Sequence, residues 1–188
     1  MKTSFVLLVI DMQVDFFERV PALAAQRASI VAAINALVAE FRRASQPVVW
    51  VRQEFAADLS DAFLDMRRHN TAITIAGTNG CEILPELDQR AGDHVIVKKR
   101  YSAFFGTGLE DVLAPFSPAT LVLAGINTHA CIRTTAIDAY QRDYDVILAG
   151  ECVGSGDREH HEMTLNYLDD HIVRIWSNPD LAARLRDV

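Results

Sequence analysis

Short apolar runs that could form buried strands alternate with helix-forming segments along the whole chain. They lie near residues 4–10, 48–51, 94–98, 119–124, 145–149 and 172–176. Strands joined through helices lie parallel to one another, and the helices then cover both faces of the sheet. The alternation therefore predicts an α/β fold of three layers, in which a six-stranded, mainly parallel sheet has helices on both faces.

The segments between these runs carry helix signals. Residues 22–44 place apolar side chains on one helical face, at Ile30, Ile34, Leu37, Val38 and Phe41. Shorter helices are expected near residues 58–68, 107–114, 129–142 and 157–170, the last of them with Asp157 as N-cap. A final helix is expected after the sixth strand, with Asn178 as its N-cap and Pro179 at its first helical position. The irregular stretch 53–93 is expected to cover or line a site.

Length and composition favour one domain over residues 1–188. Half of the residues are apolar, and the net charge of −7 with no basic run longer than residues 98–100 argues against a nucleic-acid partner. The first apolar run, residues 5–10, is too short for a secretory signal or a membrane span, so we expect no membrane partner. Three cysteines without CxxC spacing favour a reducing compartment, the cytoplasm.

Three chemically reactive side chains each stand at the end of a predicted strand. Asp11 follows FVLLVI, Lys98 ends HVIVK, and Cys131 lies in the first turn of the helix after the fourth strand. In open α/β sheets, ligands bind outside the carboxyl ends of the strands. A carboxylate that can take the thiol proton, an ammonium group that favours the thiolate, and the thiol itself predict a cysteine-nucleophile site, and hence a hydrolase.

Each of these residues also has a structural explanation. Asp11 could cap a strand end, and a lysine at a strand end is usually solvated. The doublet Lys98–Lys99 leaves the position of the lysine open, since alternation places the two on opposite faces. Free cysteines are mostly inert core residues, which we expect for Cys81 and Cys152. Cys131 differs because the start of a helix stabilises an anion and its amides can bind an oxyanion.

The histidines and glycines do not indicate a second kind of site. His129 is two residues from Cys131 and points to another side of a helix, and His160 and His161 are expected to be solvated. No HxxxH or HExxH spacing supports a metal. The glycine pairs near residues 105–108 and 154–156 lack the third glycine of a dinucleotide fingerprint, so no cofactor is expected and a nucleotide-binding domain ranks last.

The segments IDMQVDFF, GTNGCEILPEL, VKKRYSAFFGTGLEDVL, AGINTHACIRTTAIDAY and DYDVILAGECVGS together cover most of residues 5–155. Through them the chain resembles the isochorismatase-like cysteine hydrolase superfamily, in its amidohydrolase branch. The resemblance implies a Rossmann-like sheet and a catalytic triad of Asp11, Lys98 and Cys131, and it selects Lys98 from the doublet. It also implies a homo-oligomer, either a dimer or a tetramer.

The resemblance assigns further residues around the nucleophile. A cis peptide is implied between Ile126 and Asn127, and the backbone amides of Asn127 and Cys131 are the candidates for an oxyanion hole. The implied substrate-binding residues are Gln13, Phe16, Tyr101 and Phe104. Residues 53–80 and 100–106 would shape the pocket. Arg52, Arg67 and Arg68 could bind a substrate carboxylate, although surface ion pairs are the plainer role for each.

Two departures from family patterns narrow the function. The segment VRQEFAADLSD after the second strand has no histidine, unlike metal-dependent nicotinamidases. Isochorismatases that cleave a vinyl ether typically lack the cysteine, so Cys131 favours cleavage of a C–N bond in a small amide, ureido or N-carbamoyl compound through a thioester acyl-enzyme. A vinyl ether hydrolase and a non-catalytic binding or redox module that carries a reactive thiol remain the alternatives.

Overall fold

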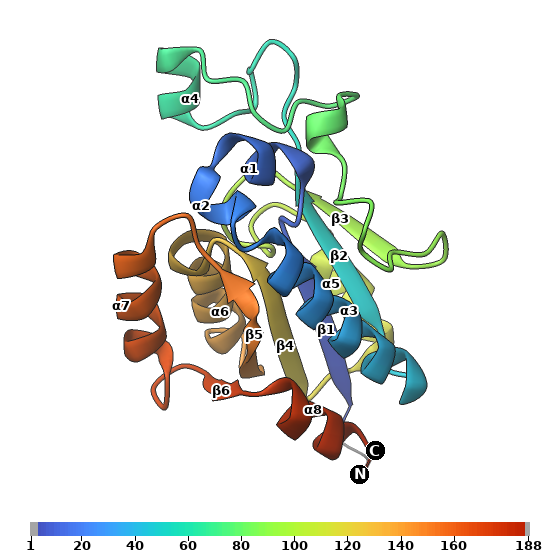
Figure 1. Ribbon diagram of the computed structural model, residues 1–188. Coiled ribbons are helices and arrows are strands. Elements are labelled where there is room, and N and C mark those ends of the chain that lie inside the picture. Colours follow the sequence, from blue (N-terminus) through green and yellow to red (C-terminus); the bar gives the residue numbers. More distant parts are fainter. Residues whose placement is uncertain (1–3, 187–188) are drawn as a thin grey trace.

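The computed structural model describes residues 4–186 and shows one six-stranded sheet flanked by helices (Figure 1). The strands are β1 (Phe5–Ile10), β2 (Val48–Gln53), β3 (His94–Lys98), β4 (Thr120–Ile126), β5 (Asp145–Gly154) and β6 (Arg174–Trp176). All neighbouring pairs are parallel, in the order β3-β2-β1-β4-β5-β6. This confirms the predicted α/β fold, and the strand order reverses between β1 and β4.

Helices cover both faces of the sheet because successive strand side chains point to opposite sides. Leu7 and Val9 of β1 pack toward α3 (Arg27–Arg43) and α8 (Asn178–Leu185). Val6 and Leu8 pack toward α5 (Leu109–Leu113), α6 (Arg133–Tyr140) and α7 (Arg158–Leu168). The central strands β1 and β4 are therefore buried along their whole length, as expected for a parallel sheet that is covered twice. None of the helices within residues 4–186 has the length and apolar character needed to cross a bilayer.

Several elements differ from the sequence-based expectation at their ends. The long helix predicted over residues 22–44 is two helices, α2 (Pro21–Ala24) and α3, because the chain turns at Gln26, whose side-chain amide donates to the carbonyls of Ala22 and Ser155. A short helix, α1 (Val14–Arg19), precedes them and was not predicted. The sixth strand begins at Arg174, two residues later than predicted, after a turn at Asp170 with a positive φ of 58°.

The N-cap of α8 was predicted one residue too late. Ser177 is the cap, because its hydroxyl accepts a hydrogen bond from the amide of Asp180. Asn178 instead accepts a contact from the Cys152 thiol and donates to the carbonyl of Ala33. The N-cap predicted for α7 is confirmed, since the Asp157 carboxylate accepts from the amide of His160.

The stretch between β2 and β3 lies beyond the carboxyl end of the sheet, where Figure 1 shows α4 (Leu64–His69) at the top of the molecule. Asp15 of α1 anchors this stretch, because its carboxylate accepts from the amide of Thr74 at 2.7 Å and from the Arg19 side chain at 2.8 Å. A Cβ atom on Gly80 would lie 2.3 Å from the same carboxyl group. Glycine at this position therefore lets the chain close down on α1.

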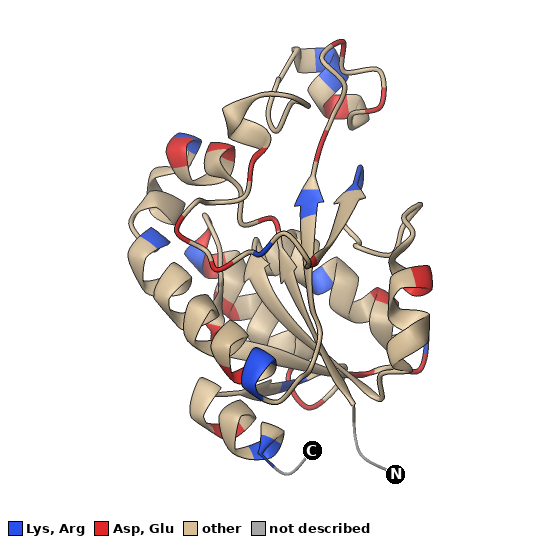
Figure 2. Ribbon diagram, turned by 90° about the vertical axis from the view of Figure 1, so that its right-hand side faces the viewer, with Lys and Arg blue, Asp and Glu red and all other residues tan. Residues whose placement is uncertain are grey.

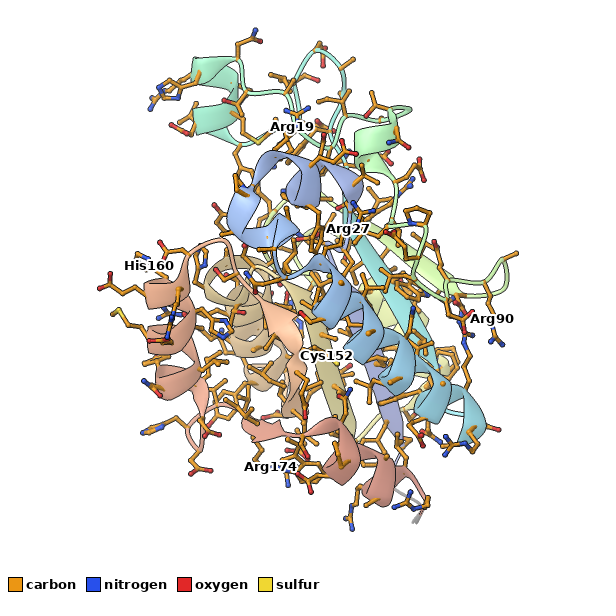
Figure 3. All side chains as sticks on the ribbon, viewed as in Figure 1. Arg19, Arg27, Arg90, Cys152, His160 and Arg174 are labelled. Carbon is orange, nitrogen blue, oxygen red and sulfur yellow. The ribbon has the colours of Figure 1, made fainter. Side chains whose placement is uncertain are left out.

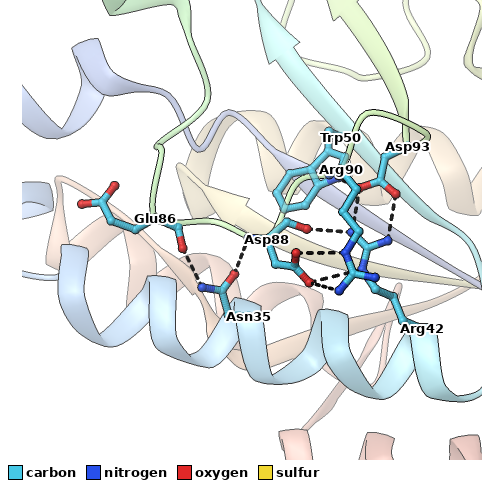
Figure 4. Close-up of polar contacts among 7 residues, drawn as sticks. All are labelled: Asn35, Arg42, Trp50, Glu86, Asp88, Arg90 and Asp93. Atoms are coloured by element: carbon cyan, nitrogen blue, oxygen red, sulfur yellow. Dashed lines mark hydrogen bonds and ion pairs between the residues drawn. The ribbon is translucent and has the colours of Figure 1, made fainter.

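A polar cluster ties the return of this stretch to the body of the molecule (Figure 4). Arg42 of α3 donates to both carboxylate oxygens of Asp93, at 2.9 and 2.7 Å, and the indole of Trp50 donates to the same carboxylate at 2.8 Å. Asp93 directly precedes β3. The cluster therefore fixes where the strand that ends in Lys98 begins.

Elsewhere, Figure 2 shows acidic and basic residues interspersed over helices and loops.

Candidate active site

Asp11, Lys98 and Cys131 meet at the carboxyl edge of the sheet. Nζ of Lys98 lies 2.8 Å from Oδ2 of Asp11 and 3.4 Å from Sγ of Cys131. The exposed fractions of the three residues are 1%, 0% and 6%, so all three are almost completely withdrawn from water. The three positions that the sequence separates by more than thirty residues each are thus brought into direct contact through Lys98.

The backbone at the end of β1 and β4 makes room for this contact. Asp11 has a positive φ of 56°, a conformation that aspartate tolerates better than most residues, and its amide donates to the carbonyl of Val51. Gly125 of β4 has a φ of +118°, and a Cβ atom there would lie 2.0 Å from the carbonyl oxygen of Ile10. Only glycine allows β4 to approach the last residue of β1 this closely.

The structure distinguishes the two lysines of the doublet. Lys98 and Ile96 point into the molecule, whereas Val95 and Val97 are 41% and 37% exposed on the other face. Lys99 turns outward and pairs with Asp61 at 2.8 Å. Lys98 therefore is the lysine that reaches the thiol, because the pleat of an edge strand sends alternate side chains to opposite faces.

The charges of the site favour an ammonium beside a neutral thiol. Burial alone would lower the pKa of Lys98, but Asp11 and Cys131 raise it above its ordinary value, so the amine stays protonated. Burial, followed by the negative charge of Asp11, raises the pKa of the Cys131 thiol, and Lys98 only partly opposes this. Lys98 therefore does favour the thiolate, but burial and the charge of Asp11 outweigh its effect on the pKa of the Cys131 thiol. Oδ1 of Asp11 is buried and accepts no hydrogen bond from residues 4–186.

Cys131 lies on a π-helical turn, Thr128–Ile132, that leads into α6. The peptide between Ile126 and Asn127 is cis, and the carbonyl of Asn127 accepts from the amides of Ala130 and Ile132. The turn thus starts immediately after β4 and presents the thiol at the strand order reversal. An oxyanion hole made by the amides of Asn127 and Cys131 stays a prediction.

Two of the implied substrate-binding residues have other partners. Both polar atoms of the buried Gln13 side chain are used by backbone, since Nε2 donates to the carbonyls of Gln53 and Cys81 and Oε1 accepts from the amide of Gln53. Phe104 is 4% exposed and lies in the core, with its ring stacked on Tyr144 and beneath the guanidinium of Arg142. Gln13 and Phe104 hold the fold together at these positions.

Tyr101 lies on the surface beside a mostly apolar pocket of about 300 Å³. Its ring centroid is 4.8 Å from that of Phe63, and the pocket wall is completed by Arg100, Ser102, Phe105, Thr134 and Asp138. Phe105, 65% exposed, stands where Phe104 was expected. In an irregular segment the sequence gives no rule for which of two adjacent phenylalanines faces outward. Phe16 is half-buried and packs against the core.

Among the arginines that could bind a substrate carboxylate, Arg100 was not predicted, and one edge of its guanidinium has no partner within residues 4–186. Its Nη1 donates to the carbonyls of Asp61 and Lys99, and its guanidinium lies over the ring of Phe63. Its Nε and Nη2 make no hydrogen bond or ion pair within residues 4–186. Arg52 is paired with Glu54 and Glu82 as expected, while Arg67 and Arg68 are exposed on α4.

The remaining cysteines are buried, as predicted, and all three cysteines are unpaired. Burial raises the pKa of the Cys81 thiol to about 11 and that of the Cys152 thiol to about 12. Figure 3 labels Cys152 in the body of the molecule. Unlike Cys131, which lies against the ammonium of Lys98, these thiols donate to oxygens, Cys81 to the carbonyl of Gln53 and Cys152 to Oδ1 of Asn178, which suits an inert role.

The histidines are placed partly against expectation. His160 is exposed and bonds only to Asp157, as predicted for a solvated residue. His161 is half-buried instead, with Nδ1 2.9 Å from the hydroxyl of Thr128, and Nδ1 of His129 lies 2.7 Å from the hydroxyl of Ser155. The sequence could not show this, because α7 and the turn of Cys131 meet only in the fold. Within residues 4–186, no group of three His, Cys, Asp or Glu side chains gathers as metal ligands would.

Comparisons with known proteins show the family to which this sequence is similar. A match to the Isochorismatase domain covers residues 5–179. A probable inactive nicotinamidase of Arabidopsis thaliana is 37% identical over 171 residues, which cover 87% of this chain and 86% of that protein.

Solved structures of the same kind superpose over nearly the whole chain. An isochorismatase family protein from Desulfovibrio vulgaris matches with a TM-score of 0.88 at 30% identity, covering 98% of this chain and 100% of that one. An N-carbamoylsarcosine amidase from Thermoplasma acidophilum matches with a TM-score of 0.78 at 27% identity, covering 94% and 97%. Fold and sequence together show that this chain belongs to the isochorismatase family of hydrolases.

Proposed function

We propose that the chain is a cysteine hydrolase that cleaves the C–N bond of a small amide, ureido or N-carbamoyl compound through a thioester acyl-enzyme. The observation that supports this most directly is the ammonium of Lys98 within 2.8 Å of the Asp11 carboxylate and 3.4 Å of the Cys131 thiol. The similar N-carbamoylsarcosine amidase is named for the cleavage of such a bond. Asp11, Lys98 and Cys131 act as the catalytic triad in this proposal.

The first half of the reaction forms the acyl-enzyme. Asp11 accepts the thiol proton as Sγ of Cys131 attacks the substrate carbonyl, and Lys98 stays charged to stabilise the new negative charge. The raised pKa of the thiol fits this order, because the proton leaves only when the carbonyl is in place. The amides of Asn127 and Cys131 bind the oxyanion of the tetrahedral intermediate. Protonated Asp11 gives its proton to the leaving nitrogen, and the C–N bond breaks.

The second half releases the acid. Asp11, again a carboxylate, takes a proton from water, and the oxygen of that water attacks the thioester carbonyl. The C–S bond breaks, the proton on Asp11 returns to the sulfur of Cys131, and the acid leaves. Ammonia or an amine and one acid are produced for each water consumed, so the enzyme returns to its starting state.

The pocket beside Tyr101 is the proposed site for the body of the substrate. Its lining includes Phe63, Tyr101, Phe105 and Arg100, and Nε and Nη2 of Arg100 are unpaired within residues 4–186. That edge of a guanidinium binds a carboxylate through two parallel hydrogen bonds. We therefore expect a substrate whose apolar body carries a carboxylate at the end remote from the amide. This replaces Arg52, which is already paired, as the candidate anion-binding residue.

The experiment is a screen for ammonia release over small amides, ureides and N-carbamoyl amino acids, followed by intact-mass spectrometry of the enzyme with each positive compound. We expect an acyl adduct that appears and then disappears in the wild type and is absent in Cys131→Ala. Cys152→Ala is the control, because it removes a buried thiol remote from Lys98. Near-normal turnover by Cys131→Ala would rule out the covalent route.

The two alternatives make different predictions in the same experiment. A vinyl ether hydrolase of the isochorismatase type needs Asp11 and Lys98 but no thiol, so Cys131→Ala would keep its activity on isochorismate. The second alternative is a non-catalytic binding or redox module, and the similarity to a probable inactive nicotinamidase is the reason to test it. Such a module would never release product, although its thiol could be modified. Turnover that depends on Cys131 excludes both.

The cellular setting belongs to the same proposal. Three unpaired cysteines suit the reducing cytoplasm.

Exposed apolar side chains at Tyr101, Phe105, Tyr140, Met163 and Tyr167 suit a homo-oligomer, either a dimer or a tetramer. Light scattering on the purified protein at several concentrations tests the assembly, and a monomer throughout would contradict it.

A further inference from the structure

Three successive residues before the nucleophile, Asn127, Thr128 and His129, are each bonded to one other segment of the chain. Oδ1 of Asn127 accepts from the amide of Gly156 at 2.9 Å, and the hydroxyl of Thr128 donates to the carbonyl of Gly154 at 2.9 Å. Nδ1 of His129 lies 2.7 Å from the hydroxyl of Ser155. The turn that carries Cys131 is therefore held by the end of β5 and the loop that leads into α7.

His161 of α7 completes this connection. Its Nδ1 lies 2.9 Å from Oγ1 of Thr128, whose exposed fraction is 0%. The single proton of the Thr128 hydroxyl is given to Gly154, so the hydroxyl can only accept from His161. His161 must then carry its proton on Nδ1, which fixes its tautomer. Burial lowers the pKa of His161, which favours the neutral ring that this arrangement needs.

Thr128 is the first residue of the π-helical turn, and Cys131 lies on the same turn three residues later. We propose that His161, acting through the hydroxyl of Thr128, is a positioning residue that holds the turn so that the Cys131 thiol stays within reach of Lys98. His161 has no contact with the thiol, with Lys98 or with Asp11 among the hydrogen bonds of residues 4–186. Its effect on the reaction is therefore indirect. The activity arm of the test rests on the proposed hydrolase function.

The matched variants follow from the hydrogen-bond chemistry. His161→Asn keeps an N–H donor on the atom that replaces Nδ1, whereas His161→Leu keeps bulk and removes the donor. Thr128→Val keeps the shape and removes the hydroxyl, whereas Thr128→Ser keeps the hydroxyl. His171→Leu is the control for the loss of an imidazole, because His171 is exposed and its ring bonds only to the carbonyl of Asp169. His160, which Figure 3 labels on α7, is unsuitable because its ring centroid lies 5.7 Å from that of His129 on the turn of Cys131.

In the activity arm, we expect His161→Leu and Thr128→Val to lower kcat by about 10- to 100-fold with little change in KM, since a displaced nucleophile costs rate more than binding. His161→Asn and Thr128→Ser should recover most of kcat, and His171→Leu should resemble the wild type. Thermal unfolding of each variant checks that the protein is folded. Loss of activity only in proportion to the unfolded fraction would overturn the inference, as would failure of His161→Asn to rescue.

A second arm needs no substrate. The rate of alkylation of Cys131 by iodoacetamide, followed by peptide mapping across pH 6 to 10 in steps of about one unit, reports how the thiol sits against Lys98 and Asp11. We expect the pH profile to shift in His161→Leu and Thr128→Val and to match the wild type in His161→Asn and His171→Leu. An unchanged profile in His161→Leu would overturn the inference. If no compound is turned over but the profile shifts as stated, the hydrolase proposal fails while the positioning role stands.

Discussion

At the scale of single residues, the positive charge of Lys98 compensates the buried negative charge of Asp11. Its ammonium and the Asp11 carboxylate form an ion pair at 2.8 Å with 0% and 1% of their side chains exposed. Removing one partner of such a pair leaves the other charge buried and uncompensated, whereas removing both charges together can be nearly neutral for stability. Stability and catalysis can therefore be separated at this pair.

We expect Lys98→Met to lower the free energy of unfolding by about 3–5 kcal/mol and to abolish turnover. The double variant Asp11→Asn with Lys98→Met should recover most of that stability and none of the activity. Urea denaturation together with the ammonia assay makes the comparison. A double variant as unstable as Lys98→Met alone would show that the loss comes from packing and not from the unpaired carboxylate.

Arg100 provides a prediction on substrate choice. Arg100→Gln should raise KM for a carboxylated amide by about tenfold or more, since a hydrogen bond to a charged group contributes about 1.5–3 kcal/mol. The neutral amide of equal length should be unaffected. Arg184→Gln, on α8 at the other end of the molecule, is the control. Equal losses on both amides would remove Arg100 from substrate binding.

At the scale of elements, the site depends on how closely β4 approaches β1. The Cα partners at the carboxyl end of the pair are Ile10 and Gly125, and Gly125 has the left-handed φ that lets its chain pass the carbonyl of Ile10. Asp11 follows one strand and the turn of Cys131 follows the other. The separation of these two strands thus sets the separation of the Asp11 carboxylate and the Cys131 thiol.

We expect Gly125→Ala to lose most of its activity. An unfavourable φ alone costs about 1–3 kcal/mol. The destabilisation should exceed this, because the added Cβ would also lie 2.0 Å from the Ile10 carbonyl oxygen. Gly150→Ala in β5 is the matched control, since its Cβ would have its nearest contact at 3.4 Å. Denaturant unfolding and turnover measure both. Similar stabilities for the two variants would mean that β4 can shift without cost.

At the scale of the whole molecule, acid should act on the fold in stages. Burial lowers the pKa values of His129 and His161 below 6.5. The negative charges of Asp157 near His129 and of Glu162 near His161 oppose this lowering, whereas His160 adds to the lowering at His129. Burial alone would raise the pKa of Asp93, but hydrogen bonds from Arg42, the Arg90 amide and Trp50 lower it below 3.8.

The sign follows from proton binding, because the unfolded chain binds protons to these groups at a higher pH than the folded chain does. The two histidines make their full contribution to stability above about pH 6.5, and this contribution is lost as the pH falls below that value. The contribution of Asp93 is lost only below about pH 4. Urea unfolding at pH 7.5 and 5.5 brackets the ordinary imidazole pKa by about one unit on either side. Between these pH values, the free energy of unfolding should fall less in the double variant His129→Gln with His161→Asn than in the wild type. An equal loss would assign the transition to other groups.

Much of the fold could be read from local patterns. The alternation of apolar runs and helical segments predicts the parallel sheet, and the apolar strands leave Asp11 and Lys98 as conspicuous charges at strand ends. Errors concentrate where a choice depends on neighbours distant in sequence. Ser177 and Asn178 are both good caps, and only the contact of Asn178 with Cys152 shows why Ser177 serves. Phe104 and Phe105 are identical in type, and packing against Tyr144 alone separates them.

The sequence by itself determined the class of fold and the chemical types of the three reactive residues, because hydrophobic periodicity and strand-end charges are local properties of the chain. Only the tertiary structure decided that the ammonium of Lys98 touches both Asp11 and Cys131, that Gln13 is consumed by backbone bonds, and that His161 reaches the hydroxyl of Thr128. The physical reason is that hydrogen bonds and burial join residues from different elements, and those meet only when the sheet and its helices have packed.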